Sequence, residues 1–183
     1  MITLELGETL ADLEGILALQ RINHATAVAP EQWAGQGFVT MQYTMAQLQA
    51  MCGSYRHVVA KRDGAVVGYA LVMLKEHKEA FPFLRDMFES IETGSVRAKP
   101  LRDCAYVVMG QVCVAAEWRG QGLARRMYGK LKEQMSADFE FVLTEVSSKN
   151  VRSMRAHLDV GFRDIEMQTD VPSEWHVIAW DWT

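Results

Sequence analysis

The stretch WRGQGLARRM, from Trp118 to Met127, constrains this chain more than any other segment. Two glycines stand two residues apart, directly before a run in which Leu123, Met127, Leu131 and Met135 recur every four residues. That spacing predicts one buried face of a helix, and the apolar run AYVVMGQVCV just upstream predicts a central strand. A strand, a glycine-rich turn and a helix N-terminus in this order can bind an anion, because the first amides of a helix lack internal partners.

Two well-known phosphate loops match this stretch poorly. A nucleotide P-loop ends in Gly-Lys-Ser/Thr, which Leu123-Ala124-Arg125 does not supply. A dinucleotide-binding fingerprint is matched in part, by Gly120-x-Gly122 and by Glu145 further along the chain. However, Arg125 stands at the position of its third glycine, and five residues separate the strand from the glycines. A dinucleotide site therefore stays a weaker alternative, and a tight turn with a solvated arginine is another.

Alternating and apolar runs predict the strands of an α/β domain. The sequence Asp63-Gly64 between two such runs is a strong hairpin signal. The predicted strands are 2–6, RHVVAKR and AVVGYALVML around that turn, 105–114, FEFVLTEV (139–146), and a last hairpin from Phe162 through a turn at Asp170 to Ser173 into HVIAWDW.

Capping signals predict the helices. Thr9 with Asp12 and Thr44 with Gln47 form capping boxes, and a helix from Asn150 to about Val160 is closed by Gly161. The first helix is expected to turn Leu10, Leu13, Ile16, Leu17 and Leu19 or Gln20 inward, and the second to end at Gly53. Residues 75–103 are expected at the surface near the substrate, with a helix around Phe83–Ile91 and a loop after it.

Composition limits the partners and the compartment. The formal net charge is −4, which gives no basic field for nucleic acid, although five basic residues gather at Arg119, Arg125, Arg126, Lys130 and Lys132. The three cysteines have no metal-type spacing, and no apolar run reaches the length of a membrane span. We expect a single domain over residues 1–183, in the cytoplasm, with reduced cysteines, no metal, no nucleic acid and no membrane partner.

Three ordered motifs resemble the Gcn5-related N-acetyltransferase (GNAT) family. The family's pyrophosphate loop, Gln/Arg-x-x-Gly-x-Gly/Ala, is matched by Arg119, Gly122 and Ala124, and VCVAAEW resembles the fourth strand and turn that lead into it. The segment from Asn150 to Phe162 resembles the family's Asn-x-x-Ser/Ala helix that closes in Gly-Phe. The resemblance, carried by residues 105–162, implies an α/β fold with a mixed, mostly antiparallel seven-stranded sheet and helices on both faces.

The resemblance also implies acetyl-CoA as the donor substrate. Its pyrophosphate is expected on the amides of the loop, which are those of Arg119, Gly120, Gln121, Gly122, Leu123 and Ala124. The fourth and fifth strands are expected to splay, so that free backbone groups around Val112 and Val114 bind the pantetheine arm and the thioester carbonyl. Asn150 is expected to contact the CoA arm, to cap its helix, or both.

Acetylation of an amine needs a base and can use an acid. Glu145 is the candidate base, because its place resembles that of the base glutamate in bacterial ribosomal-protein N-terminal acetyltransferases; the alternative is a solvated or arginine-paired strand residue. His157 stands where many family members carry a tyrosine that protonates the CoA thiolate. A histidine can donate a proton, but it can equally be a packing residue, with water protonating the thiolate.

The acceptor is expected to be a primary amine on a small molecule or a peptide, and the acidic balance favours a cationic one. Tyr106, Gln111 and Cys113 are candidates for its pocket, and strand alternation puts Gln111 on the same face as Met109 and Cys113. The missing tyrosine keeps a second function open, a catalytically silent acyl-CoA sensor or interaction module. Assembly as a homodimer is left open.

Overall fold

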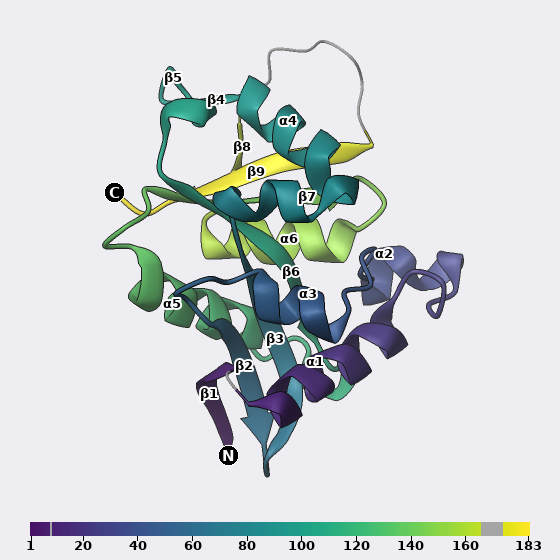
Figure 1. Ribbon diagram of the computed structural model, residues 1–183. Helices are drawn as coiled ribbons and strands as arrows, with labels where there is room; N and C mark the ends of the chain where they lie inside the picture. The colour runs from purple at the N-terminus through teal and green to yellow at the C-terminus, as the bar shows by residue number, and fades with distance from the viewer. Residues whose placement is uncertain (8, 166–173) are drawn as a thin grey trace.

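The computed structural model describes residues 1–7, 9–165 and 174–183, and one sheet forms its centre (Figure 1). Over these residues the sheet has seven strands in the order β1-β2-β3-β6-β7-β9-β8. Every neighbouring pair is antiparallel except β6 with β7. The strands are β1 (Ile2–Gly7), β2 (His57–Arg62), β3 (Ala65–Leu74), β6 (Tyr106–Val114), β7 (Phe141–Ser147), β8 (Arg163–Asp164) and β9 (Trp175–Asp181). The predicted mixed, mostly antiparallel seven-stranded sheet is confirmed.

Helices cover both faces of this sheet. In Figure 1, α1, α3 and α4 lie on the near face, while α5 and α6 lie behind it. The helices are α1 (Leu10–Asn23), α2 (Trp33–Gln36), α3 (Met45–Ala50), α4 (Arg85–Thr93), α5 (Leu123–Met135) and α6 (Val151–Val160), and short 3-10 helices span Pro30–Gln32, Lys75–Ala80, Pro82–Leu84, Leu101–Asp103 and Ala116–Trp118. The α/β class with helices on both faces is therefore confirmed.

The local signals in the sequence set several of these boundaries. Both capping boxes form, at Thr9 with Asp12 and at Thr44 with Gln47, and the Asp63-Gly64 turn has positive φ at both residues, 51° and 83°. Leu10 does not face inward as predicted, because it opens α1 ahead of the buried stripe and stays 59% exposed. The predicted turn at Asp170 to Ser173 lies outside the described residues.

The segment from Lys75 to Asp103 contributes to the core more than its sequence suggested. Its helix spans Arg85–Thr93, two residues beyond the predicted range, and a small ribbon of β4 (Ser95–Val96) and β5 (Lys99–Pro100) follows. Phe81, Phe88 and Ile91 are at most 1% exposed and belong to the main hydrophobic cluster. The segment covers the near face of the sheet, rather than lying on the surface throughout.

The feature that positions the site is the divergence of β6 and β7. In the described residues these parallel strands pair at three positions, from Tyr106 with Phe141 to Val108 with Leu143. Beyond them β7 stays paired with β9 and β6 with β3, so a gap opens inside the sheet. The splay expected from the family resemblance is present.

A β-bulge at Gly110 marks the start of this gap. Leu71 and Val72, which are neighbours on β3, pair with Gln111 and Met109, so Gly110 is left over on β6. Adjacent residues of a strand point to opposite faces, so Gln111 and Met109 do as well. The prediction that they share a face is wrong, because strict alternation fails across the bulge.

Candidate active site

A cleft lies where β6 and β7 diverge. Three parts of the chain meet around it: the segment that leads from α2 toward α3, the two splayed strands, and the start of α6. The lining residues are Phe38, Val39, Thr40, Met41, Gly110, Gln111, Val112, Thr144, Glu145, Val146, Ser147, Asn150, Ser153, His157 and Trp175. Five residues predicted from the sequence, Gln111, Val112, Glu145, Asn150 and His157, are thus brought together.

The glycine loop presents a row of backbone amides next to this cleft. Gly120 and Gly122 have φ of 75° and 71°, a left-handed conformation that favours glycine, and no atom lies within 4 Å of where a Cβ would stand. Within the described part of the chain, the amides of Gly120 to Arg125 have no hydrogen-bond acceptor. With α5 starting at Leu123, these donors and the helix dipole make the predicted anion site geometrically sound.

Arg119 differs from the rest of the loop. Its amide donates to the carbonyl of Ala116 (3.3 Å), so this N–H is already used in a turn. Its guanidinium donates to Val114 O (2.9 Å) and to the end of α2, at Gln36 O and Oε1. Among the described bonds of the six predicted pyrophosphate residues, Arg119 is thus the residue whose backbone amide is already used by the protein itself.

Side chains, and not the backbone of β7, bond the carbonyls of β6 along the gap. Thr144 Oγ1 donates to Met109 O (3.1 Å), and Tyr43 OH donates to Gly110 O (3.2 Å). Val114 O accepts from Arg119, while no described residue supplies a side-chain partner for the backbone of Val112. Val112 therefore keeps the open edge that a pantetheine amide would require, and Val114 keeps less of it.

Glu145 faces the cleft from β7 and is held at an unusual pKa. Burial raises the pKa of its carboxyl to about 7, because removal from water penalises the charged form. No hydrogen bond or ion pair reaches the carboxylate from the residues that the structure describes. Side chains alternate along β7, so Glu145 lies on the same face of the sheet as Phe141. Arg97 lies over the ring of Phe141, on the near face that carries α4.

His157 lines the same cleft from α6, but both of its ring nitrogens are engaged. Nδ1 lies 2.7 Å from the carbonyl of Ser153, so it carries the proton, and Nε2 accepts from Tyr128 OH at 2.6 Å. Burial lowers its pKa to about 4. The ring is neutral near pH 7, and its one proton is donated to the backbone.

Asn150 has the capping role that was one of its two expected roles. Its Oδ1 accepts from the Ser153 amide (3.3 Å), and its Nδ2 donates to Phe38 O (2.8 Å). The second bond connects the start of α6 to the α2 segment, which no sequence signal indicated. A contact with the CoA arm stays a prediction.

The three predicted acceptor-pocket residues have different positions. Gln111 lines the cleft, where its Oε1 accepts from Tyr69 OH (2.6 Å) and its Nε2 donates to Met41 O (3.0 Å). Cys113 is buried beside it and does not line the cleft, and burial raises the pKa of its thiol to about 12. Tyr106 lies at the far end of β6, where its hydroxyl donates to Glu92 (3.2 Å).

Sequence reasoning missed the segment from Phe38 to Met41. It had no predicted role in the site, and it forms one wall of the cleft. The signal that could have found it is weak, because the segment has neither glycine motif nor charge. Its backbone is placed by distant partners, including Asn23 O, which accepts from Val39 N (2.9 Å).

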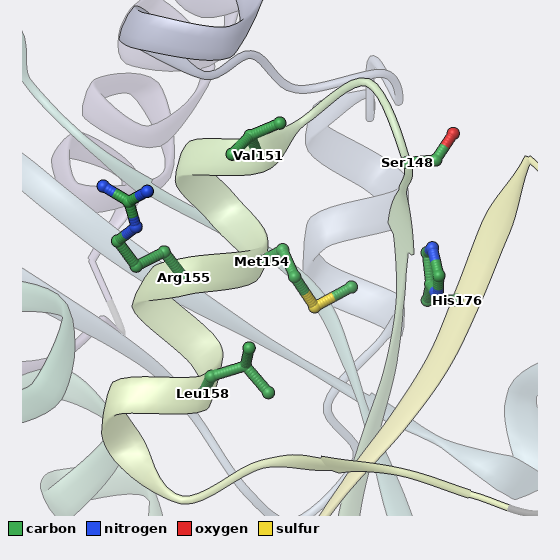
Figure 2. Close-up of a pocket in the computed structure, with 6 residues that line it drawn as sticks. All are labelled: Ser148, Val151, Met154, Arg155, Leu158 and His176. Carbon is green, nitrogen blue, oxygen red and sulfur yellow. The ribbon is translucent and has the colours of Figure 1, made fainter.

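A second hollow lies on the outer side of α6 and is separate from the cleft. Figure 2 shows Met154 pointing from α6 toward His176 on β9, with Ser148 at the rim. None of the predicted site residues lines this hollow.

The described residues contain no group of three or more His, Cys, Asp or Glu side chains arranged to hold a metal ion. In the same residues, no helix has the length and apolarity to cross a membrane.

Comparison with known proteins identifies the family. Residues 25–162 match the model of the acetyltransferase (GNAT) family. No curated protein matches the chain. Among solved structures, Arabidopsis thaliana NAA60 in complex with acetyl-CoA is 15% identical, with a TM-score of 0.64 and 99% of each chain covered.

Two further structures share the fold at low identity. The ribosomal-protein-S18-alanine N-acetyltransferase from Escherichia coli is 14% identical, with a TM-score of 0.57 over 100% of this chain and 95% of that one. Diaminobutyrate acetyltransferase EctA from Paenibacillus lautus, in complex with its substrate and coenzyme A, is 16% identical, with a TM-score of 0.57 over 100% and 96%. The amide-lined loop, the splayed strands and the matching family model together show that this chain belongs to the GNAT acetyltransferase family.

Proposed function

We propose that the protein transfers an acetyl group from acetyl-CoA to a primary amine, by direct attack of the amine on the thioester. One observation carries the proposal: the gap between β6 and β7 brings Val112 and the buried carboxyl of Glu145 into one cleft, and the row of loop amides follows β6 in the chain. The loop suits a pyrophosphate, and the carboxyl suits proton removal from an ammonium. A donor that runs from the loop along β6 into the cleft would meet the acceptor amine at Glu145.

The donor is held by this chain's backbone. The amides from Gly120 to Ala124 would receive the pyrophosphate, with α5 adding its positive end. Val112 and Asn150 lie along the cleft toward the thioester end. Solved relatives of this fold hold acetyl-CoA or coenzyme A, which supports the choice of donor.

Glu145 is the proposed base. Its carboxylate takes a proton from the ammonium, and the freed nitrogen attacks the thioester carbonyl. The tetrahedral intermediate then loses its surplus N–H proton to water in the cleft and breaks its C–S bond, which releases the amide and the CoA thiolate. A pKa of about 7 suits this work, because the group is half ionised near neutral pH and still basic enough to accept the proton.

His157 is the predicted acid, and its geometry makes this role costly. Release of the Nδ1 proton to the thiolate would require Nε2 to take the hydroxyl proton of Tyr128, and burial raises the pKa of that hydroxyl far above its usual range. We therefore propose that the thiolate takes its proton from water in the cleft. His157 then serves to hold α6 against α5.

The acceptor is proposed to be an amine of a small molecule or of a peptide. Proteins with this fold include one whose name specifies a ribosomal-protein alanine and one bound to L-2,4-diaminobutyric acid. The alanine of that ribosomal protein and L-2,4-diaminobutyric acid would each offer a primary amine, and the two acceptors differ in size. A cytoplasmic location is also proposed, because the three cysteines are buried and unpaired, as in reducing compartments.

The second candidate function is a catalytically silent acyl-CoA sensor. The engaged ring of His157 favours it, since the usual acid position then offers no free proton. A sensor would bind acetyl-CoA at the same loop but release no thiol, whichever amine is added.

Thiol release from acetyl-CoA, measured against a panel of peptide amines and small primary amines, tests the proposal. The wild type should release CoA with at least one amine. Glu145→Gln should bind acetyl-CoA normally and lose about 10²-fold or more in kcat. Binding without turnover across the panel would favour the sensor, and absence of acetyl-CoA binding would overturn both.

A further inference from the structure

The side chain of Arg119 is hydrogen-bonded to three elements of the fold that precede the glycine loop in the chain. Its Nε donates to Val114 O (2.9 Å) and its Nη1 to Gln36 O (3.0 Å) and Oε1 (2.8 Å), while its Nη2 donates to Asn23 Oδ1. These four acceptors come from β6, from the end of α2 and from the end of α1. The fork of the guanidinium thus joins three elements.

Two side chains near the start of α6 donate hydrogen bonds to the same short segment, residues 35–38. Arg152 donates to Gly35 O (3.0 Å) and Asn150 to Phe38 O (2.8 Å), both from the first turn of α6. With Arg119 on Gln36 O, three side chains from the donor-binding end of the fold hold three carbonyls between residues 35 and 38. The carbonyl end of α2, which carries partial negative charge, faces two guanidinium groups.

This segment runs directly into the wall of the cleft. Phe38, Val39, Thr40 and Met41 all line it, and the Val39 amide donates to Asn23 O (2.9 Å). Asn23 therefore holds Arg119 through its side chain and the wall through its backbone. The position of the wall depends on Arg119 through both Gln36 and Asn23.

We propose that Arg119 is a positioning residue for the acceptor amine, one that fixes the wall from Phe38 to Met41 and leaves the pyrophosphate to the amides that follow it. The inference rests on the proposed acetyl transfer. It separates two tasks within one loop, in which the backbone from Gly120 to Ala124 serves the donor and the guanidinium serves the acceptor. A lysine at this position keeps the charge but cannot reach three elements at once.

The test is Arg119→Lys, with acetyl-CoA affinity measured by calorimetry and the KM of the amine by thiol release. The dissociation constant of acetyl-CoA should change by less than about threefold, while the KM of the amine should rise about tenfold, as expected for loss of a charge-assisted hydrogen bond. Arg126→Lys is the matched control, because that arginine lies in the first turn of α5, just after the loop, and bonds Ile2 O (3.3 Å), away from the wall. It should change neither constant.

Asn23→Ala gives a second route to the same result. It removes one acceptor of Arg119 without touching the glycine loop, and it should raise the KM of the amine as well. In the Asn23→Ala/Arg119→Lys double variant, the rise in the KM of the amine should be smaller than the two single effects combined, because both substitutions remove the same bond between Arg119 and Asn23. A weaker affinity for acetyl-CoA in Arg119→Lys, with no change in the KM of the amine, would make the guanidinium a phosphate ligand and overturn the inference.

Amide hydrogen exchange distinguishes this failure from a failure of the proposed function. Without any substrate, Arg119→Lys should speed exchange at residues 36–41 and leave the strands β2 and β3 unchanged, relative to Arg126→Lys. Unchanged exchange at 36–41 would contradict the positioning role, whether or not the protein turns over acetyl-CoA. A wild type that releases no thiol would contradict the proposed function, and the exchange result would still decide what holds the wall.

Discussion

Burial shifts the pKa values of the two predicted catalytic side chains in opposite directions. It raises the pKa of Glu145 to about 7 and lowers that of His157 to about 4, because in each case the charged form loses its hydration. Near neutral pH the first can exchange a proton with an amine, and the second is neutral with both nitrogens bonded. The sequence correctly suggested these two residues as cleft residues, but only their surroundings separate a proposed base from a packing residue.

The pH dependence of kcat/KM should therefore report Glu145. With an amine acceptor, activity should rise as pH passes about 7 and the carboxyl ionises, and level off above it. Glu145→Gln should remove this rise together with most of the activity. An unchanged profile in the variant would assign the titration to another group.

The same shift predicts a stability effect. The folded pKa of Glu145 lies above its unfolded value, so the folded state binds this proton more tightly, and stability falls as pH rises from about 4.5 to about 7. Glu145→Gln should thus stabilise the fold at pH 8 by roughly 3 kcal/mol and leave it little changed at pH 4. Chemical denaturation at the two pH values measures this difference, and equal effects at both would contradict it.

Tyr128 and His157 should behave as a pair. His157→Phe leaves the fully buried Tyr128 hydroxyl without its acceptor, at a cost of about 1–3 kcal/mol, whereas Tyr128→Phe/His157→Phe removes both polar groups. The double variant should therefore be less destabilised than the sum of the singles. His157→Phe should keep its turnover within about threefold once folded; a loss of 10²-fold or more, with normal acetyl-CoA binding, would restore the acid role.

At the scale of elements, periodicity and caps predicted most of the fold, and non-local contacts decided the rest. The capping boxes of α1 and α3 and the hairpin turn between β2 and β3 are local events, so their residues predicted them. The bulge at Gly110 is not local. It depends on pairing with β3 and on the hydroxyl of Tyr43, which donates to the Gly110 carbonyl.

Gly129 inside α5 and Gly161 at the C-terminal cap of α6 differ in whether their positions can accept a side chain. Gly129 lies inside α5 with no atom within 4 Å of a Cβ, so Gly129→Ala should stabilise the protein by about 0.5–1 kcal/mol. Gly161 has φ of 129°, and a Cβ there would meet Trp180 Nε1 at 3.0 Å, so Gly161→Ala should destabilise it. Thermal unfolding of the two variants checks the contrast, and effects of equal sign would contradict it.

At the scale of the whole molecule, the order of motifs was predictable and their spatial neighbours were not. Residues 105–162 carry the loop, the splayed strands and α6, and the fold they implied is present. The wall from Phe38 to Met41 is far from them in sequence and reaches the cleft through bonds from Arg119, Asn150 and Gln111. That residues 1–183 form a single domain stays a prediction.

The central claim is that the glycine loop holds a CoA pyrophosphate. A thermal-shift comparison with acetyl-CoA, CoA and NAD tests it most directly, since a ligand at a hundred times its dissociation constant adds about 2.7 kcal/mol of stability. We predict a clear shift with both CoA species and none with NAD, and loss of that shift in Gly122→Glu, whose carboxylate would stand over the loop amides. Stabilisation by NAD alone, or by none of the three, would contradict it.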